Sequence, residues 1–157
     1  MDTLAIGSVT RFSLLCRAGG LLCALPLEHI IETMRPMPLD VLPGTPHFVA
    51  GMAIVRGEPL PVLLLSRLFG KEEKRAERLV IARAGTRRVA LAVESVVGVR
   101  ALEPELLQRL PPLLRDAPQD AVAEIGTLDG ELMVVLQAAR LVPAEVFAIV
   151  EAEAAAS

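Results

Sequence analysis

The sequence predicts an all-β protein made of two similar small barrels packed side by side, with short helical turns and a C-terminal helix. Three observations support this fold class. Twelve Pro and eleven Gly residues interrupt short runs of Val, Ile and Leu, which is typical of short strands joined by turns. Glycine-containing turns place three β-hairpins. The chain also resembles itself at an offset of about 66 residues, which indicates two copies of one unit.

The hairpins follow from turn chemistry, because glycine readily adopts the positive φ that a tight hairpin turn requires. Their turns are Gly19-Gly20, Gly85-Thr86 and Asp129-Gly130. The flanking strands are predicted at residues 11–17 and 21–27, 79–84 and 87–93, and 122–128 and 131–136.

The two-residue turn at Gly19-Gly20 also sets the register of the first hairpin. It places three facing pairs on one side of the pleat: Cys16 with Cys23, Leu14 with Leu25, and Phe12 with Leu27. This apolar side is the predicted core face. The other side carries Arg11, Ser13 and Arg17, so we expect burial on one side only.

The remaining elements are assigned more simply. Strands are predicted at residues 30–35, 48–55 and 59–65, and Pro59 and Pro61 would suit an edge strand. A single helical turn at 66–69 should stop at Gly70, and Pro143 should open the terminal helix. A charged linker at 71–78 and a Pro-rich loop at 109–120 connect the strands.

The repeat defines the expected domain organisation. Residues 10–145 form one domain with halves at 10–70 and 78–141, strand exchange between the halves is left open, and residues 143–157 form a terminal helix or tail. The core-face residues of the first hairpin fall on apolar residues of the second: Val80, Ala82, Val89 and Leu91. A unit of about 65 residues is marginally stable alone, so we expect the two units to pack together with a cleft between them.

Composition excludes several functional classes. Sixteen basic and nineteen acidic residues give a net charge of −3, and Trp and Tyr are absent, so nucleic-acid binding is not expected. No apolar run is long enough to span a membrane and no signal peptide is recognised, so we expect a cytoplasmic protein without direct membrane insertion.

Residues 49–62 resemble the signature of CheW-like chemotaxis coupling proteins: a glycine, a short apolar stretch, Arg-Gly, and Pro-Val on the next strand. Further matches in the same order are Ala24-Leu25-Pro26-Leu27 with Ile30, Glu32 and Arg35, then Leu91-Ala92-Val93-Glu94 with Val96 and Val99, then Gly126-Thr127-Leu128-Asp129-Gly130. The resemblance covers residues 11–141, and the order and spacing of the motifs carry it.

This resemblance implies a non-enzymatic adaptor of two SH3-like five-stranded β-barrel subdomains, without a cofactor. Such proteins bridge the cytoplasmic tips of methyl-accepting chemoreceptors to the regulatory domain of a CheA-type histidine kinase, in arrays at the inner face of the membrane. The receptor tip lies in a groove between the subdomains, beside the arginine of the Arg-Gly motif. By resemblance, Arg56 and Gly57 match that motif, and Ile30 and Glu32 match groove positions.

Two positions depart from the family pattern. Ile54 stands where the family usually has Asn, and Leu64 where it usually has Asp. Both changes replace a polar group with an aliphatic one. They raise the alternative of an adaptor that serves a chemosensory-like pathway other than motility.

Candidate partner-binding residues follow from this pattern. The Arg56 guanidinium beside a groove could form two hydrogen bonds to a carboxylate or to carbonyls of a partner helix. The alternative is a solvent-exposed turn residue, and the family resemblance favours the binding role. Leu15 and Leu22 could form an apolar protein-binding patch, or could pack against the second barrel or the terminal helix. The full predicted set is Ile30, Glu32, Arg35, Ile54, Arg56, Gly57, Leu15 and Leu22.

The sequence gives less support to a metal site, a disulfide, an enzyme or a small-molecule site. Cys16 and Cys23 could form a disulfide, or bind a metal with His29 and His47. A cytosolic compartment disfavours the disulfide and the closely paired spacing of zinc ligands is absent, so buried free thiols are expected. Neither histidine lies in a recognisable catalytic motif, so an enzyme is the least favoured alternative. A β-barrel that binds an apolar small molecule in the cleft between the barrels is the other alternative.

Overall fold

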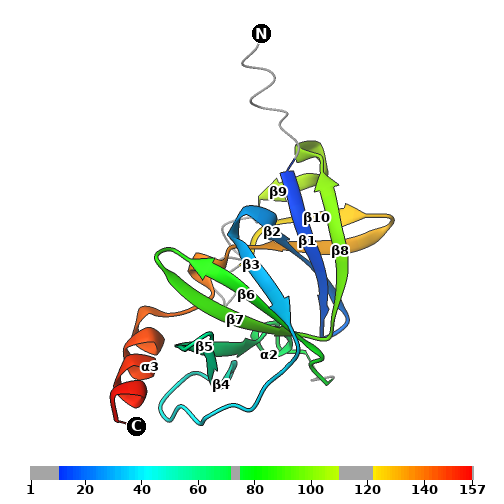
Figure 1. The fold of residues 1–157 in the computed structure, drawn as a ribbon. Helices are drawn as coiled ribbons and strands as arrows, with labels where there is room; N and C mark the ends of the chain where they lie inside the picture. Colours follow the sequence, from blue (N-terminus) through cyan, green and yellow to red (C-terminus); the bar gives the residue numbers. More distant parts are fainter. Residues whose placement is uncertain (1–10, 72–74, 110–121, 157) are drawn as a thin grey trace.

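The computed structural model describes residues 11–71, 75–109 and 122–156, whose strands form two strongly curved sheets, one above the other in Figure 1. The upper sheet, lobe 1, has the strand order β8-β1-β2-β11-β10-β9. Its strands are β1 (Arg11–Ala18), β2 (Leu21–Pro26), β8 (Ser95–Leu102), β9 (Leu107–Arg109), β10 (Val122–Leu128) and β11 (Glu131–Leu136).

The lower sheet, lobe 2, has the order β3-β6-β7-β5-β4. Its strands are β3 (Ile30–Met34), β4 (Val49–Val55), β5 (Glu58–Leu64), β6 (Arg78–Ala84) and β7 (Arg87–Val93). The helices are short apart from the last: η1 (Leu27–His29), α2 (Leu65–Leu68), η2 (Pro104–Leu106), η5 (Ala138–Arg140) and α3 (Ala144–Ala156). The predicted all-β class and terminal helix are confirmed; β8 and the short β9, the sixth strand of lobe 1, were not predicted.

The two lobes exchange strands reciprocally. The first half of the chain supplies β1 and β2 to lobe 1 and β3, β4 and β5 to lobe 2, whereas the second half supplies β6 and β7 to lobe 2 and the remaining strands to lobe 1. The registers obey the sequence repeat: the parallel ladder of β11 and β2 pairs Val135 with Ala24, and that of β5 and β7 pairs Val62 with Ala90. Neither predicted half is a lobe by itself.

The three predicted hairpins are present, and their turns have the expected backbone. Gly19 and Gly20 have φ values of 61° and 79°, and Asp129 and Gly130 have 51° and 80°. Positive φ at both turn positions matches the twist of the paired strands. The remaining turn, Gly85-Thr86, has positive φ at Gly85, as predicted.

The register of the first hairpin is confirmed for two of its three predicted pairs, since Cys16 faces Cys23 and Leu14 faces Leu25. The third pair was wrong. Strand β2 ends at Pro26, and the chain then turns into η1, so Phe12 pairs instead with Ala101 of β8. The Phe12 side chain is 59% exposed and therefore lies outside the core.

The expectation of burial on one side of this hairpin was also wrong. Its second face closes around the interior of lobe 1, where Leu15 is 1% and Leu22 is 4% exposed, and even Ser13 is buried. The two leucines pack with other residues of the same lobe: Ala24, Leu102, Leu128, Met133 and Val135. The predicted surface patch of Leu15 and Leu22 therefore does not exist, and neither do their alternative contacts with the second barrel or the terminal helix.

A separate apolar core lies between the lobes. It contains the predicted core-face residues of both hairpins: Leu14, Cys16, Cys23, Leu25, Val80, Ala82, Val89 and Leu91. Helix α3 adds Val146 and Val150 to this core. The terminal helix is therefore part of the core rather than a loose tail.

Strand β5 is not an edge strand, contrary to the prediction from its two prolines. It lies between β7 and β4, but its parallel ladder with β7 begins only at Val62. Pro59 and Pro61 precede that ladder, so their missing N–H groups remove no hydrogen bond to β7.

The cysteines are free and buried, as predicted. A hydrogen bond involving Cys16, together with burial, raises the pKa of the Cys23 thiol. In the described part of the chain, no group of three or more His, Cys, Asp and Glu residues could hold a metal ion.

Candidate partner-binding site

Arg56 and Gly57 form the two-residue turn between β4 and β5. Both have positive φ, 51° at Arg56 and 81° at Gly57. A Cβ on Gly57 would meet open space, so glycine is favoured there by the backbone conformation rather than by crowding. The turn places the Arg56 side chain at the tip of the hairpin, where it is 71% exposed.

The Arg56 guanidinium binds the Glu32 carboxylate with two parallel hydrogen bonds. Nε donates to Oε2 at 2.7 Å and Nη2 donates to Oε1 at 2.8 Å. Hydrogen bonding and charge from Arg56 lower the pKa of Glu32 and raise that of Arg56. Because Glu32 lies on edge strand β3, the pair joins this edge to the β4–β5 tip.

The structure therefore brings together Glu32, Arg56 and Gly57, which the sequence had selected separately. It also gives the Arg56 fork a carboxylate within the same chain, whereas the sequence suggested a carboxylate or carbonyl groups of a partner helix. The role of this arginine in partner binding stays a prediction.

The other selected residues lie apart from this pair to different degrees. Ile30 is on the same strand as Glu32 and packs partly against the inter-lobe core. Ile54 precedes the turn on β4 and is 49% exposed. Leu64, the second departure from the family pattern, is partly buried against the interior of lobe 2. Arg35 lies beyond the end of β3, in a separate groove.

A surface that the sequence did not reveal lies on lobe 1, beside Leu14 of the inter-lobe core. Phe12 faces Ala101, and Leu14 faces Val99, on the same side of the sheet. Phe12 and Val99 are 59% and 50% exposed, and neighbouring Leu27 is 37% exposed. We call Phe12, Leu27, Val99 and Ala101 the apolar patch. Since β1 and β8 are far apart in sequence, only their pairing could reveal it.

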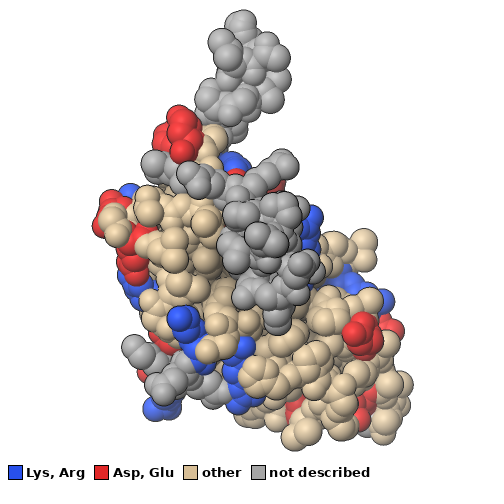
Figure 2. Space-filling model, turned by 180° about the vertical axis from the view of Figure 1, so that it is seen from behind, with Lys and Arg blue, Asp and Glu red and all other residues tan. Residues whose placement is uncertain are grey.

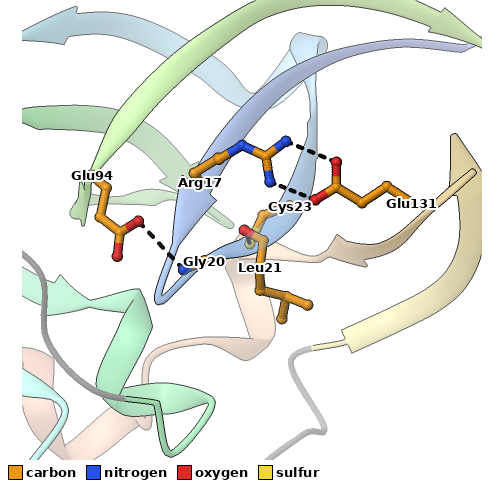
Figure 3. Close-up of polar contacts among 6 residues, drawn as sticks. All are labelled: Arg17, Gly20, Leu21, Cys23, Glu94 and Glu131. Atoms are coloured by element: carbon orange, nitrogen blue, oxygen red, sulfur yellow. Dashed lines mark hydrogen bonds and ion pairs between the residues drawn. The ribbon is translucent and has the colours of Figure 1, made fainter. Parts of the chain in front are cut away.

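The lobes are fastened together beside the first hairpin. The Gly19 and Gly20 amides donate to the Glu94 carboxylate at 2.6 and 3.4 Å, and the Glu94 amide donates to the Arg17 carbonyl at 2.8 Å. Arg17 also binds Glu131 through two hydrogen bonds of 2.5 and 2.8 Å (Figure 3). This pair lowers the pKa of Glu131 and fixes the β2–β11 side of lobe 1.

Lobe 1 has an ion pair that, like Arg56–Glu32, joins a hairpin turn to an edge strand, but with the charges reversed. Asp129, the first turn residue of the β10–β11 hairpin, binds Arg100 of edge strand β8 at 3.3 Å. The acid is thus on the turn and the base on the edge strand. The two lobes share an architecture but present opposite charges at these tips.

A family model for the CheW-like domain matches residues 13–146. This chain belongs to the CheW-like domain family. It is 36% identical over 111 residues to Protein FrzA of Myxococcus xanthus, a match that covers 69% of this chain and 66%, just under two thirds, of that protein.

The CheW-like fold is also supported by a solved structure. The scaffolding protein TtCheW from Thermoanaerobacter tengcongensis superposes with a TM-score of 0.73 at 20% identity, covering 82% of this chain and 90% of that one. This likeness confirms two SH3-like barrels.

Among the described residues, no helix has the length and apolar character needed to cross a bilayer.

Proposed function

We propose that this chain is a non-enzymatic adaptor that couples the cytoplasmic tips of methyl-accepting chemoreceptors to the regulatory domain of a CheA-type histidine kinase. Membership of the CheW-like family supports an adaptor role. The structurally similar TtCheW is itself described as a scaffolding protein. Coupling then rests on simultaneous binding, because a bias in one bound partner changes the binding free energy of the other.

The apolar patch is the observation that carries the receptor half of this proposal. Its Val99 faces Leu14, which belongs to the inter-lobe core, so a partner placed there would bury exposed apolar area next to that core. Helix η1, which carries Leu27, leads directly into β3, which carries Glu32. An apolar surface with charged groups nearby suits an amphipathic helix with one apolar stripe, such as a receptor tip provides.

The alternative of an apolar small-molecule ligand fits the structure less well. Two of its grooves are lined by charged side chains, one including Arg35, Arg75 and Arg78 and the other including Arg87, Arg88 and Glu151. Such linings favour charged ligands over apolar ones.

Binary titrations test the proposal. Val99→Glu should weaken binding of a receptor cytoplasmic fragment about tenfold or more, because it buries an unpaired carboxylate in the contact. Leu132→Glu is the matched control: Leu132 is 53% exposed on lobe 1 but lies outside the patch, so we expect less than about twofold change. Equal effects of both variants would contradict the assignment of the patch.

Two further arms complete the test. The wild-type chain should bind a CheA-type regulatory domain, and a mixture of the three proteins should elute as one complex in size-exclusion chromatography. Arg56→Ala should weaken receptor binding while leaving the melting temperature nearly unchanged, because an exposed ion pair adds little stability. Failure of the wild-type chain to bind either partner would overturn the adaptor proposal.

A further inference from the structure

A groove of about 560 Å³ lies at the junction of the lobes, separate from the apolar patch. It is formed by the chain after β3, the chain before β6, and the junction of β7 and β8. Its lining includes Arg35, Arg75, Glu77, Arg78, Glu94 and Val96. We call it the arginine groove. On the face shown in Figure 2, Lys and Arg side chains lie at several separate places on a mostly uncharged surface.

Two of these arginines lie immediately beyond the last pair of a strand ladder. Strands β3 and β6 pair antiparallel, with Met34 facing Leu79. Arg35 follows Met34 and Arg78 precedes Leu79, so the two arginines occupy the next positions after the last paired residues. Like charges opposite each other on neighbouring strands destabilise a sheet unless an anion compensates them.

The chain itself supplies little compensation. In the parts of the chain that the structure describes, no ion pair links Arg35, Arg75 or Arg78 to a carboxylate. Glu94 lines the groove, but its two oxygens accept the Gly19 and Gly20 amides. The groove therefore keeps an excess of positive charge on a chain whose net charge is −3.

The sequence repeat shows how this groove is related to the apolar patch. With the offset of about 66 residues, Arg78 corresponds to Phe12 and Arg35 to Ala101. Phe12 and Ala101 face each other on β1 and β8, and the two arginines occupy the equivalent positions just beyond the last pair of the β3–β6 ladder. The two copies thus offer equivalent surfaces with different chemistry, one apolar and one cationic.

We propose that the arginine groove is a second docking site, which binds an acidic segment of a partner protein. Guanidinium groups bind carboxylates through paired, charge-assisted hydrogen bonds. Glu77 and Glu94 lie among the arginines and disfavour a compact dianion such as phosphate, whereas separate carboxylates along a peptide can avoid them. The site is distinct from the apolar patch, so an acidic partner and a receptor tip can bind together.

The test is fluorescence anisotropy of the full chain with a short fluorescein-labelled Glu-Ala peptide at low salt. Arg78→Gln and Arg35→Gln should each weaken binding about fivefold to tenfold, since one charge-assisted pair is lost. Arg83→Gln is the control because Arg83 is also exposed on β6, outside the groove, and carries the same charge. It should change binding less than about twofold.

A second readout separates binding from structure. Arg35→Gln should leave the melting temperature unchanged or raise it, because it removes one of three positive charges that line the same groove. Equal weakening by Arg83→Gln, absence of wild-type binding, or a matching affinity for a Gln-Ala peptide would each overturn the proposal. So would displacement of the labelled peptide by inorganic phosphate at lower concentration than by unlabelled Glu-Ala peptide.

Discussion

Arg56 and Glu32 hold each other in one orientation at the surface of lobe 2. Both side chains contact solvent, so their pairing contributes little to the stability of the fold. Its effect is on geometry: the planar fork fixes where the guanidinium lies and which donors face outward. A partner that contacts the β4–β5 tip therefore meets an ordered pair rather than a freely rotating arginine.

The pH dependence of this pair can be measured directly. Arg56 lowers the pKa of Glu32, so the pair is intact above the usual carboxyl range and is lost only as the pH falls through the lowered value. A carbon-13 NMR titration should place the midpoint of Glu32 below 4.5, the value of an unperturbed glutamate. In Arg56→Ala, we expect the midpoint to move up towards 4.5.

Glu131 provides an internal control for this titration. Arg17 lowers its pKa in the same way, and Arg17 does not contact Arg56 in the structure described. Glu131 should therefore keep its low midpoint in Arg56→Ala. Identical titration curves for Glu32 in the wild type and the variant would contradict the pairing.

Sequence reasoning could find the members of this site but not their pairing. Arg56 and Gly57 were marked by a turn signal and a family motif, both of which are local. Glu32 lies 24 residues earlier, and no local pattern indicates that its carboxylate receives the Arg56 fork. Phe12 and Val99 were missed as a surface for the same reason.

Among the elements, β4 shows how a glycine fixes a neighbouring loop. Asp40 and Met52 exchange two backbone hydrogen bonds of 2.8 Å. A Cβ on Gly51, which has φ 154°, would lie 2.5 Å from the Asp40 carbonyl oxygen. The absence of a side chain lets the loop lie directly on the strand.

Gly51→Ala should therefore destabilise the protein by about 3 kcal/mol, because the strand and the loop must separate and the backbone is strained. Gly44→Ala is the control: Gly44 also has positive φ, but its Cβ would meet open space, so we expect about 1 kcal/mol. Urea unfolding measures both values. Similar losses in the two variants would show that close contact with Asp40 is unimportant.

Secondary-structure elements were predicted correctly where the residues that determine them are close together in the sequence. The hairpins were found because each turn and its flanking strands are contiguous in sequence. The burial of both faces of β1 and β2 was missed, although residues 21–25 form an unbroken apolar run, which is typical of strands buried on both sides. The sequence of strand β8, Ser95–Leu102, contains no such apolar run because Gly98 and Arg100 interrupt it, and two of its valines are exposed in the structure.

Across the whole molecule, the reciprocal exchange of strands decides how the protein folds. Each lobe takes one hairpin from one copy of the repeat and its remaining strands from the other. The repeat revealed two copies, but it could not determine the exchange, because equivalent strands can pair within a copy or between copies with the same contacts.

Fragments cut within residues 72–74 test this exchange. Each fragment alone lacks strands of both lobes and should remain largely unfolded by NMR and circular dichroism. Mixed in equal amounts, the two fragments should recover the spectrum of the intact chain. A fragment that folds by itself, with the dispersed NMR spectrum of a barrel, would contradict the exchanged topology.

The tightness of the crossings between lobes has a mechanical consequence. Two connections join a strand of one lobe to a strand of the other. One is η1, between β2 and β3, and the other is the single residue Glu94, between β7 and β8. Connections this short do not allow the lobes to separate by a hinge motion. A force applied to one lobe is transmitted to the other through the backbone. Partner proteins bound to the two lobes therefore move together.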